Sequence, residues 1–386
     1  MTKKLYYQDS HIHEFTAVVL SCEEKNDHYL IELDQTAFFP EGGGQYADIG
    51  RIDDVEIFDV HEKNGIVYHY GKAPLSIGNT VRGKIDWERR FESMQQHTGE
   101  HIVSGIVHER FGYDNVGFHL GDDYCTMDFN GPITKDELLE IEKSANGYVF
   151  QNLKVNVMYP DKEELASLTY RSKIEIEGQV RIVNIPGVDT CACCAPHVKY
   201  TGEIGLIKLV DMVNYKGGQR ITMQAGFRAL SDYREKEQSV KCISASLCVK
   251  EADVAASVDR LKEEIAALKG QLVASKGKLL KIQSETIDIH ERIVTVFDAA
   301  LKGNEPRELM NLLLEKGAYI CAVFAGDDAN GFRYVIGSKE QDVRLLSKSL
   351  NAAFSGRGGG KPNMVQGTLV GQSSKIREFL QSQTED

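Results

Sequence analysis

Short runs of alternating apolar and polar residues fill the first part of the chain. Residues 16–20 and 28–33 alternate in this way, and Gly, Asn and Asp residues separate such runs along the segment 16–84. Alternation over four to eight residues with turn residues between the runs is typical of antiparallel strands. The pattern therefore predicts a small antiparallel β-barrel, which we assign to a first domain of residues 1–86.

The periodicity changes to that of a helix after this segment. Residues 87–110 contain no proline, and Phe91, Met94, Ile102 and Ile106 recur at helical intervals. Strands resume between 123 and 212 around a short helix near 135–146, whose start is marked by a capping-box pattern of Thr and Glu three residues apart. These features predict a second domain of mixed α+β structure at residues 87–231.

A long apolar seam follows in residues 232–283, which contain no proline. Apolar residues fall there on alternating steps of four and three, with only Ser275 off the pattern: Val254, Val258, Leu261, Ile265, Leu268, Leu272, Leu279 and Ile282. Such spacing predicts a coiled coil of about four heptads within a helical linker at 232–300, and the coiled coil would make the chain a homodimer. An antiparallel helical hairpin, broken near Gly270 or Gly277, is an equally open alternative.

The last part of the chain, residues 301–386, has the pattern of a small α/β domain. A helix is predicted at 309–314 and strands at 319–324 and 332–336, and a glycine-rich stretch occupies 356–360. The four segments together predict an α+β multidomain protein.

Composition and charge narrow the class of protein. The chain has 386 residues with 42% hydrophobic and 26% charged residues, as in ordinary globular proteins. It has no window of about 18 uninterrupted apolar residues and no apolar core after its N-terminal residues, so we expect no membrane association and a cytoplasmic protein. A net charge of -12 argues against non-specific polyanion binding, although the near-neutral last domain could still meet a nucleic acid.

The predicted helix at 87–110 carries a pair of potential metal ligands. His97 and His101 are four residues apart, which places both imidazoles on one face of a helix about one turn apart. The pair alone is weak evidence, because two surface histidines often have this spacing.

A cysteine cluster supplies the second half of the site. Cys191, Cys193 and Cys194 are too close together for a disulfide framework, and such clusters often bind metal. Cys193 and His197 are again ligand types four residues apart, although Cys191 or Cys194 could take the place of Cys193. Two such pairs suit one tetrahedral zinc ion per chain. The predicted ligands are His97, His101, Cys193 and His197.

A different zinc chemistry competes with this interpretation. His97, two residues, Glu100 and His101 also match the HxxEH motif of a class of metallopeptidases, in which the glutamate is the general base. Glu175 or Glu177 could be a distant third ligand. The peptidase hypothesis leaves the Cys193 pair unexplained, and it is kept as the alternative.

Several motifs in order along the chain resemble a known family. The helix motif 96–101, the segment 178–183, the Cys-x-x-x-His pair and the segment 201–205 resemble the editing domain shared by alanyl- and threonyl-tRNA synthetases. Residues 36–45 resemble the glycine-rich motif of the alanyl branch, and residues 356–367 resemble its C-terminal DHH-associated domain. In this order and over nearly the whole chain, the motifs resemble the long form of the stand-alone alanyl-tRNA editing proteins, AlaX.

The resemblance implies hydrolysis in trans of tRNA(Ala) mischarged with serine, with glycine as a second candidate. A synthetic site for alanine cannot exclude glycine by size and rejects serine poorly. A synthetase would need a catalytic domain before this region, so we expect a hydrolase and no ATP-dependent ligase. Zinc could polarise the ester carbonyl or activate water, but four protein ligands leave no open position, so a role in placing the substrate stays equally open.

The resemblance also implies roles for further residues. Gly42, Gly43, Gly44 and Gln45 would face the substrate, although clustered glycines can equally form a simple barrel turn. Thr126 could contact the serine hydroxyl, although an ordinary β-branched strand residue is the safer interpretation.

The glycine-rich stretch of the last domain is implied to contact tRNA, because cations beside exposed backbone amides suit phosphate. The alternative is a flexible loop. The predicted tRNA-binding residues are Arg357, Gly358, Gly359, Gly360 and Lys361.

The catalytic group remains unassigned. Glu100 could be a general base, a partner of a histidine ligand or a solvated helix residue, and the last of these is favoured. A closed set of ligands also permits a third hypothesis, a non-enzymatic tRNA-binding protein with structural zinc.

Overall fold

The computed structural model describes residues 1–121, 124–172 and 179–383. The chain divides into two compact units, Met1–Ile243 and Ser244–Asp386, and each is described by itself. Both contain helices and sheets, as expected for an α+β multidomain protein. In the part of the chain that is described, no helix is both long and apolar enough to cross a membrane.

Six antiparallel strands near the N-terminus close into a barrel. In barrel order they are β2 (Glu14–Lys25), β3 (His28–Leu33), β7 (Ile66–Gly71), β6 (Val55–Lys63), β5 (Gly50–Ile52) and β8 (Thr80–Ile85). Alternate residues such as Val19, Ile31 and Val67 are buried in its core. A short 3-10 helix, η1 (Leu5–Tyr7), lies between β1 (Lys3–Lys4) and the barrel strands, and β1 pairs in parallel with β4 (Gln35–Thr36).

Helix α1 (Trp87–Phe111) follows the barrel and carries the two histidines. The Asp86 side chain caps its first turn by accepting a hydrogen bond from the Arg89 N–H, and Gly112 ends it with a φ of 71°. The helix predicted from the apolar periodicity is thus confirmed with nearly the same bounds.

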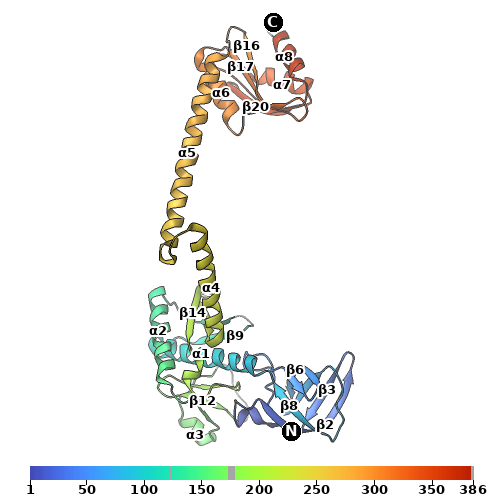
Figure 1. The fold of residues 1–386 in the computed structure, drawn as a ribbon, viewed down its shortest axis with the longest axis vertical. Coiled ribbons are helices and arrows are strands. Elements are labelled where there is room, and N and C mark those ends of the chain that lie inside the picture. The colour runs from blue at the N-terminus through green and yellow to red at the C-terminus, as the bar shows by residue number, and fades with distance from the viewer. Residues whose placement is uncertain (122–123, 173–178, 384–386) are drawn as a thin grey trace. The chain divides into compact units, whose positions relative to one another are not determined.

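The rest of the first unit packs around α1 (Figure 1). One sheet has the order β14 (Ile207–Tyr215), β15 (Gly218–Ala225), β10 (Cys125–Phe129) and β9 (Asn115–Leu120). The other consists of β11 (Asn156–Met158), β12 (Ile182–Ile185) and β13 (Asp189–Ala192). Helices α2 (Lys135–Gln151) and α3 (Lys162–Ser167) and the 3-10 helix η2 (Thr201–Ile204) complete the unit, and α2 begins with the predicted capping box.

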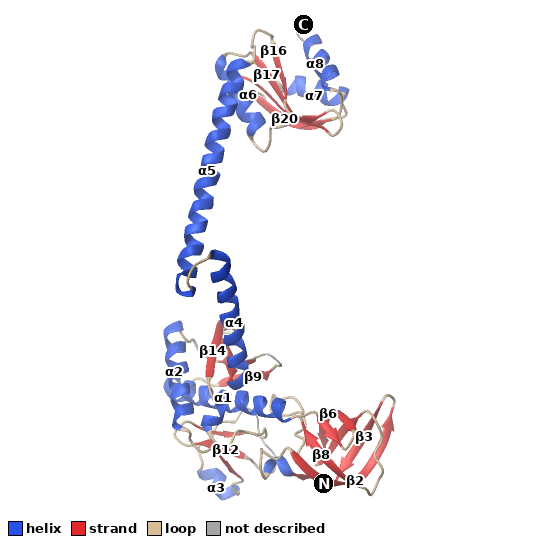
Figure 2. Cartoon of the chain, in the orientation of Figure 1, coloured by secondary structure: helices blue, strands red, loops and turns tan. Residues whose placement is uncertain are grey.

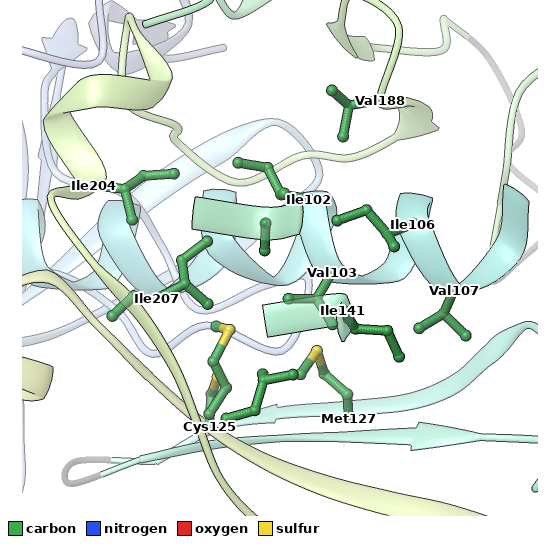
Figure 3. Close-up of a cluster of buried hydrophobic side chains, with 14 of the residues drawn as sticks. Ile102, Val103, Ile106, Val107, Cys125, Met127, Ile141, Val188, Ile204 and Ile207 are labelled. Atoms are coloured by element: carbon green, nitrogen blue, oxygen red, sulfur yellow. The ribbon is translucent and has the colours of Figure 1, made fainter. Parts of the chain in front are cut away.

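A single apolar core holds α1 between these elements. Figure 3 shows Ile102 and Val103 of α1 in the same cluster as Met127 of β10 and Ile141 of α2. Because one face of α1 is committed to this core, the position of the histidines is fixed along and around the helix axis.

One glycine lets α1 approach the turn before β13 closely. A Cβ atom at Gly105 would lie 2.3 Å from the carbonyl oxygen of Val188, so any larger residue would force the backbone apart. This close approach brings Asp189, the first residue of β13, to the helix that carries His101.

The helical linker consists of two helices. The break between them lies at residues 248–253 and not near Gly270 or Gly277, where the hairpin alternative placed it. α4 (Gly226–Leu247) ends at Cys248, which has a φ of 53°, and after the 3-10 turn η3 (Glu251–Asp253) α5 (Val254–Thr286) begins. α5 runs without interruption through Gly270 and Gly277, so the hairpin broken at these glycines is wrong. A glycine inside a long exposed helix costs only about 1 kcal/mol relative to alanine, which is too little to end it.

The second unit contains one sheet with helices on both faces (Figure 2). Its order is β16 (Ile293–Phe297), β17 (Ile320–Asp327), β18 (Gly331–Ser338), β20 (Met364–Leu369) and β19 (Arg357–Lys361), and only β16 and β17 pair in parallel. α6 (Glu305–Lys316) packs on one face, and α7 (Arg344–Ala353) and α8 (Ser373–Ser382) pack on the other. The glycine-rich stretch is the edge strand β19, so the flexible-loop alternative is wrong.

A buried ion pair joins the barrel to α1. The Arg90 side chain is 0% exposed, and its Nε donates to Oδ1 of Asp48 at 2.9 Å. Its two terminal nitrogens donate to the backbone carbonyls of Ala37 at 2.7 Å and Ser10 at 3.1 Å. Asp48 also accepts from the Phe39 N–H at 2.6 Å. The guanidinium therefore holds the segment around the glycine motif against the helix.

We expect Arg90→Met to destabilise the first unit by about 3–5 kcal/mol, because Asp48 would stay buried without its partner. Urea unfolding followed by the fluorescence of Trp87, the single tryptophan, measures this loss. The control is Arg110→Met, whose partner Glu140 is exposed, and it should cost about 0–1 kcal/mol. Equal losses for the two variants would contradict the structural role of Arg90.

Candidate metal centre

The four predicted ligands meet at one point of the first unit. His97 and His101 extend from α1, and Cys193 and His197 come from the loop after β13. Their ligand atoms all lie within 4.8 Å of one another. The Sγ of Cys193 is 3.6 Å from Nε2 of His97 and 3.4 Å from Nε2 of His197.

These separations fit a zinc ion. With Zn–N near 2.0–2.1 Å and Zn–S near 2.3 Å, a tetrahedral site has N···S edges of about 3.6 Å. The three histidines are nearly fully buried, so an ion held there would be shielded from bulk water. One thiolate with three imidazoles is a donor set that zinc prefers.

Two of the histidines are oriented by side chains outside the ligand set. The Nδ1 of His97 donates to Oε1 of Gln45 at 3.1 Å, and the Nδ1 of His197 and Oγ1 of Thr98 are hydrogen-bonded at 3.0 Å. A histidine that donates from Nδ1 keeps the lone pair of Nε2 for a metal. His97 is therefore held in the tautomer that binds an ion through Nε2, and the ring of His197 is held in place by Thr98.

The third histidine is oriented by a carboxylate. The Nδ1 of His101 donates to Oδ2 of Asp189 at 2.8 Å. Arg171 holds the same carboxylate through Nε at 2.7 Å and Nη2 at 2.9 Å. Burial alone would lower the pKa of His101, but its hydrogen bonds to Asp189 and Cys193 raise that pKa well above the usual value. The Arg171–Asp189 pair thus fixes the ring of His101.

The ionisation of two of the four ligands, Cys193 and His197, matches what a metal needs. Burial alone would raise the pKa of Cys193, but the nearby His97 and His197 and the hydrogen bonds from His101 and His197 lower it well below the usual value. Burial lowers the pKa of His197 to about 3. A thiolate and a neutral imidazole are the forms that bind zinc.

The other two cysteines of the cluster have different surroundings. Cys191 lies on β13 and groups with His101 and Asp189. Cys194 is exposed, and its Sγ would lie 3.1 Å from a Cβ built at Gly43. Among the described residues, Cys193 is the cysteine that groups with all three histidines.

The glycine motif forms a tight turn, and the same turn lines the candidate site. Gly42 and Gln45 bridge through two backbone hydrogen bonds, and Gly43 and Gly44 have φ values of 63° and 79°. These left-handed conformations favour glycine. A Cβ at Gly44 would lie 2.9 Å from the ring of Phe118, so bare backbone is also required by space.

Gln45 contacts a candidate metal ligand, and its contact with the substrate stays a prediction. Its side chain is buried, and its Oε1 orients His97. Its Nε2 is buried without a partner among the described residues. The structure therefore places this residue behind a metal ligand.

Glu100 is buried, so its interpretation as a solvated helix residue is wrong. Only 1% of the residue is exposed. Its Oε1 accepts from Oγ of Ser104 at 2.8 Å and from Nδ2 of Asn115 at 2.6 Å, and its Oε2 lies 3.8 Å from Nε2 of His101. A buried carboxylate is costly unless it is hydrogen-bonded or does chemistry.

A cavity of about 650 Å³ opens beside the metal ligands. It is lined by Gly43 and Gly44, by the ligands His97, His101 and Cys193, and by Glu100, Phe118 and Arg181 among others. Thr126 is not among the described residues that line this cavity. It lies on β10, opposite His119 and Thr222. Contact between Thr126 and a serine hydroxyl stays a prediction.

The remaining predicted residues lie away from this centre in the chain. Arg357, Lys361 and the three glycines between them form β19 of the second unit, and all five are exposed. Glu175 and Glu177, the alternative third ligands of a peptidase, and Gly178 of the editing motif lie outside the described residues.

Sequence reasoning missed the side chains that orient the histidines. Thr98 lies beside His97 in the chain, but Asp189 and Arg171 are 88 and 70 positions from His101. A pair at such separations has no local signal in one sequence.

We expect Asp189→Asn to weaken zinc binding by about 10-fold to 100-fold, the usual cost of losing a carboxylate that orients a histidine ligand. Competition with a chromophoric chelator measures the affinity. The matched control is Asp128→Asn, which breaks a similar two-point contact with Arg220 away from the ligands. Wild-type affinity in both variants, or an equal loss in both, would refute this role.

Comparisons with known proteins support the resemblance. The domain model described as the threonyl and alanyl tRNA synthetase second additional domain matches residues 180–222, and the model for class II (A) tRNA synthetases matches residues 2–89. The first match contains the loop of Cys193 and His197, and the second contains the barrel and the glycine motif.

Relatives match over most of the chain. The alanyl-tRNA editing protein AlaX-L of Pyrococcus horikoshii is 29% identical over 97% of this chain and 96% of its own length. The alanyl-tRNA editing protein Aarsd1 of Rattus norvegicus is 27% identical over 98% of this chain and 97% of its own length. An alanine–tRNA ligase of Halorubrum lacusprofundi is 33% identical over 68% of this chain but only 30% of its own length. The resemblance predicted from the motifs is thereby confirmed: the chain is similar to alanyl-tRNA editing proteins over nearly its whole length.

Proposed function

We propose that this protein hydrolyses the ester bond between serine and tRNA(Ala), with glycine as a second amino acid that it removes, in a zinc-dependent reaction. The observation that carries the proposal is the cavity in which the metal ligands, the bare backbone of Gly43 and Gly44 and the buried Glu100 meet. Similarity to named alanyl-tRNA editing proteins over nearly the whole chain supports it.

The zinc ion would be held by His97, His101, Cys193 and His197. When bound, it supplies a positive charge that can polarise a carbonyl oxygen, lower the pKa of a water molecule or fix a polar group of the substrate. The ligands, their tautomers and their burial support a site that is fully formed before the substrate arrives.

We assign to Glu100 the acceptance of the proton from the attacking water. Ser104 and Asn115 hold its Oε1, which directs Oε2 toward the side of His101 that carries Nε2. A general base must be held within reach of the reacting water, and burial inside the cavity provides this. The bare N–H groups at Gly43 and Gly44 are suited to an oxyanion or a substrate carbonyl.

The metallopeptidase alternative is less well supported. It uses His97, His101 and Glu100 but gives no role to Cys193 and His197, which group with the two histidines.

We propose that the second unit contributes contacts to tRNA through β19. Arg357 and Lys361 are the end residues of this strand and three glycines lie between them, and a Cβ at Gly359 would meet no atom within 4 Å. Cations beside exposed amides suit phosphate oxygens. We also propose that the chain is organised in four domains, at residues 1–86, 87–231, 232–300 and 301–386. The proposed location of the protein is the cytoplasm.

We further propose that α5 pairs with α5 of a second copy of the chain, in parallel. Six apolar seam residues of α5 are exposed: Leu261, Ile265, Leu268, Leu272, Leu279 and Ile282. A parallel pair would place Glu264 of one copy beside Lys269 of the other, whereas an antiparallel pair would bring the lysines at 262, 269 and 276 together. The homodimer is therefore expected to be parallel.

We expect a deacylation assay to show release of serine from Ser-tRNA(Ala), much slower release from Ala-tRNA(Ala), and loss of activity after chelation. Glu100→Gln should lower kcat by about 10²-fold to 10⁴-fold with zinc content unchanged, because an amide cannot accept the proton.

The control for this assay is Glu140→Gln, an exposed position on α2, which should leave the rate unchanged. No release by folded, zinc-loaded wild-type protein would refute the hydrolase and favour a binding protein with structural zinc. Cleavage of peptides instead of the ester would favour the peptidase.

We expect the wild-type protein to have twice the mass of one 43.1 kDa chain in light scattering after gel filtration. Leu272→Lys, at the centre of the seam, should give the mass of a single chain. Val273→Lys is the control, since Val273 is exposed on the same helix but off the seam. A monomeric wild-type protein would contradict the pairing.

A further inference from the structure

The loop that carries Cys193 and His197 lies between β13 and η2. Its residues 193–198, all of them described, belong to no helix or strand. Among the described residues, no backbone hydrogen bond joins two members of this loop. Backbone N–H and C=O groups outside regular structure need partners elsewhere. The positions of the two candidate ligands therefore depend on groups outside the loop.

Arg181 holds the end of the loop that carries Cys193. Ile182 of β12 pairs with Ala192 of β13 in antiparallel register, so Arg181 and Cys193 lie opposite each other at the next position. The Cys193 N–H donates to the Arg181 carbonyl at 3.1 Å. The Nη1 of Arg181 donates to the carbonyls of Cys193 at 2.7 Å and Ala195 at 3.0 Å. One residue thus holds three backbone groups around the cysteine.

The other end of the loop is held by different side chains. The Ser10 hydroxyl donates to the carbonyl of His197 at 2.7 Å, and the Thr98 hydroxyl oxygen accepts from the Val198 N–H at 3.3 Å. A change at Arg181 should therefore release the cysteine end of the loop and leave the histidine end in place.

The charge of Arg181 lies in a place where a charge is costly. The residue is 8% exposed, and in the described part of the chain its side-chain hydrogen bonds go to the two carbonyls and to no carboxylate. The ring centroid of Tyr7 lies 5.2 Å from the guanidinium, a favourable cation–π contact. A neutral side chain could fill the same space without the cost of burying a charge. The guanidinium is best explained by the two carbonyls that it holds.

Cys193 is the candidate ligand that this contact fixes. Its Sγ lies 3.6 Å from Nε2 of His97 and 3.4 Å from Nε2 of His197. Metal–ligand distances in such sites vary by only about 0.2 Å. A small displacement of the cysteine end of the loop would therefore take the thiolate out of reach of an ion that the histidines hold.

We infer that Arg181 is a positioning residue of the candidate metal centre: its guanidinium fixes the backbone around Cys193 and thereby holds the thiolate beside the histidines. It acts through the loop and not by contact with the ion. This inference rests on the four ligands of the proposed function, but not on the hydrolysis of an ester.

The alternative role of Arg181 is a direct contact with the substrate, because the residue also lines the cavity. Nη1 has two hydrogens, and the carbonyls of Cys193 and Ala195 accept both of them. The two roles differ in a way that can be measured. A residue that only contacts the substrate does not change how a metal is bound when no substrate is present.

The test replaces zinc with cobalt(II), whose absorption spectrum reports its ligands, in the full-length protein without tRNA. Wild-type protein should show the near-ultraviolet charge-transfer absorption of a cobalt–thiolate bond. Arg181→Met should lose most of this absorption. Its zinc affinity, measured by competition with a chromophoric chelator, should fall about 10-fold to 100-fold, the usual cost of losing a group that orients a ligand.

The matched control is Arg228→Met. The Nη1 of Arg228 also donates to a backbone carbonyl, that of Gly121 at 2.7 Å, but Gly121 is not in the loop of Cys193. This variant should keep the cobalt spectrum and the zinc affinity of the wild-type protein. Arg181→Lys keeps the stem and the charge and is measured in case Arg181→Met does not fold, as judged by circular dichroism. It should show the same changes at a smaller size.

Unchanged thiolate absorption and zinc affinity in the folded Arg181 variants would overturn the inference. Equal losses in Arg228→Met would overturn it too. A wild-type spectrum without thiolate absorption would do the same, because Cys193 would then not be a ligand. If the wild-type protein shows the absorption, the Arg181 variants lose it and no serine is released from Ser-tRNA(Ala), the positioning role is supported and only the hydrolase is refuted.

Discussion

The buried guanidinium of Arg90 fixes the distance between the barrel and the helix that carries the histidines. Its partner Asp48 follows Gln45 by three residues, and Gln45 orients His97, which lies two helical turns after Arg90. One ion pair therefore sets the register of the glycine turn against the metal centre. Because such a pair is costly to separate once buried, the two halves of the site cannot move independently.

The same constraint explains why the metal centre is built from so many segments. Gln45 comes from the barrel, Thr98 from α1 and Asp189 from β13, and each fixes the Nδ1 of a different histidine. Packing of Gly105 against Val188 brings the last of these within reach. The positions of the candidate ligands are thus a result of packing around α1.

The sequence was most informative where the signal is local. The spacing of His97 and His101 and of the second pair predicted all four residues that the structure groups together, and periodicity predicted α1. Periodicity left open whether α5 is unbroken or a hairpin, and the structure shows one continuous helix. Burial of Glu100 depends on Asn115 and on sheet packing, and the turn at 248–253 depends on one left-handed residue, Cys248. Contacts between residues far apart in the chain leave no periodic trace, so these features needed the structure.

With four protein ligands around the metal position, selectivity for the substrate has to come from other groups in the cavity. Each histidine ring is fixed by a hydrogen bond at Nδ1, so the ligands have little freedom to open a coordination position at the metal. The chain's own polar groups must therefore place the substrate. The cavity is lined by such groups: Glu100, the backbone of Gly43 and Gly44, Arg181 and two tyrosine rings. An ester bound across the ligands would be held at both ends, which is the condition under which orientation alone contributes strongly to rate.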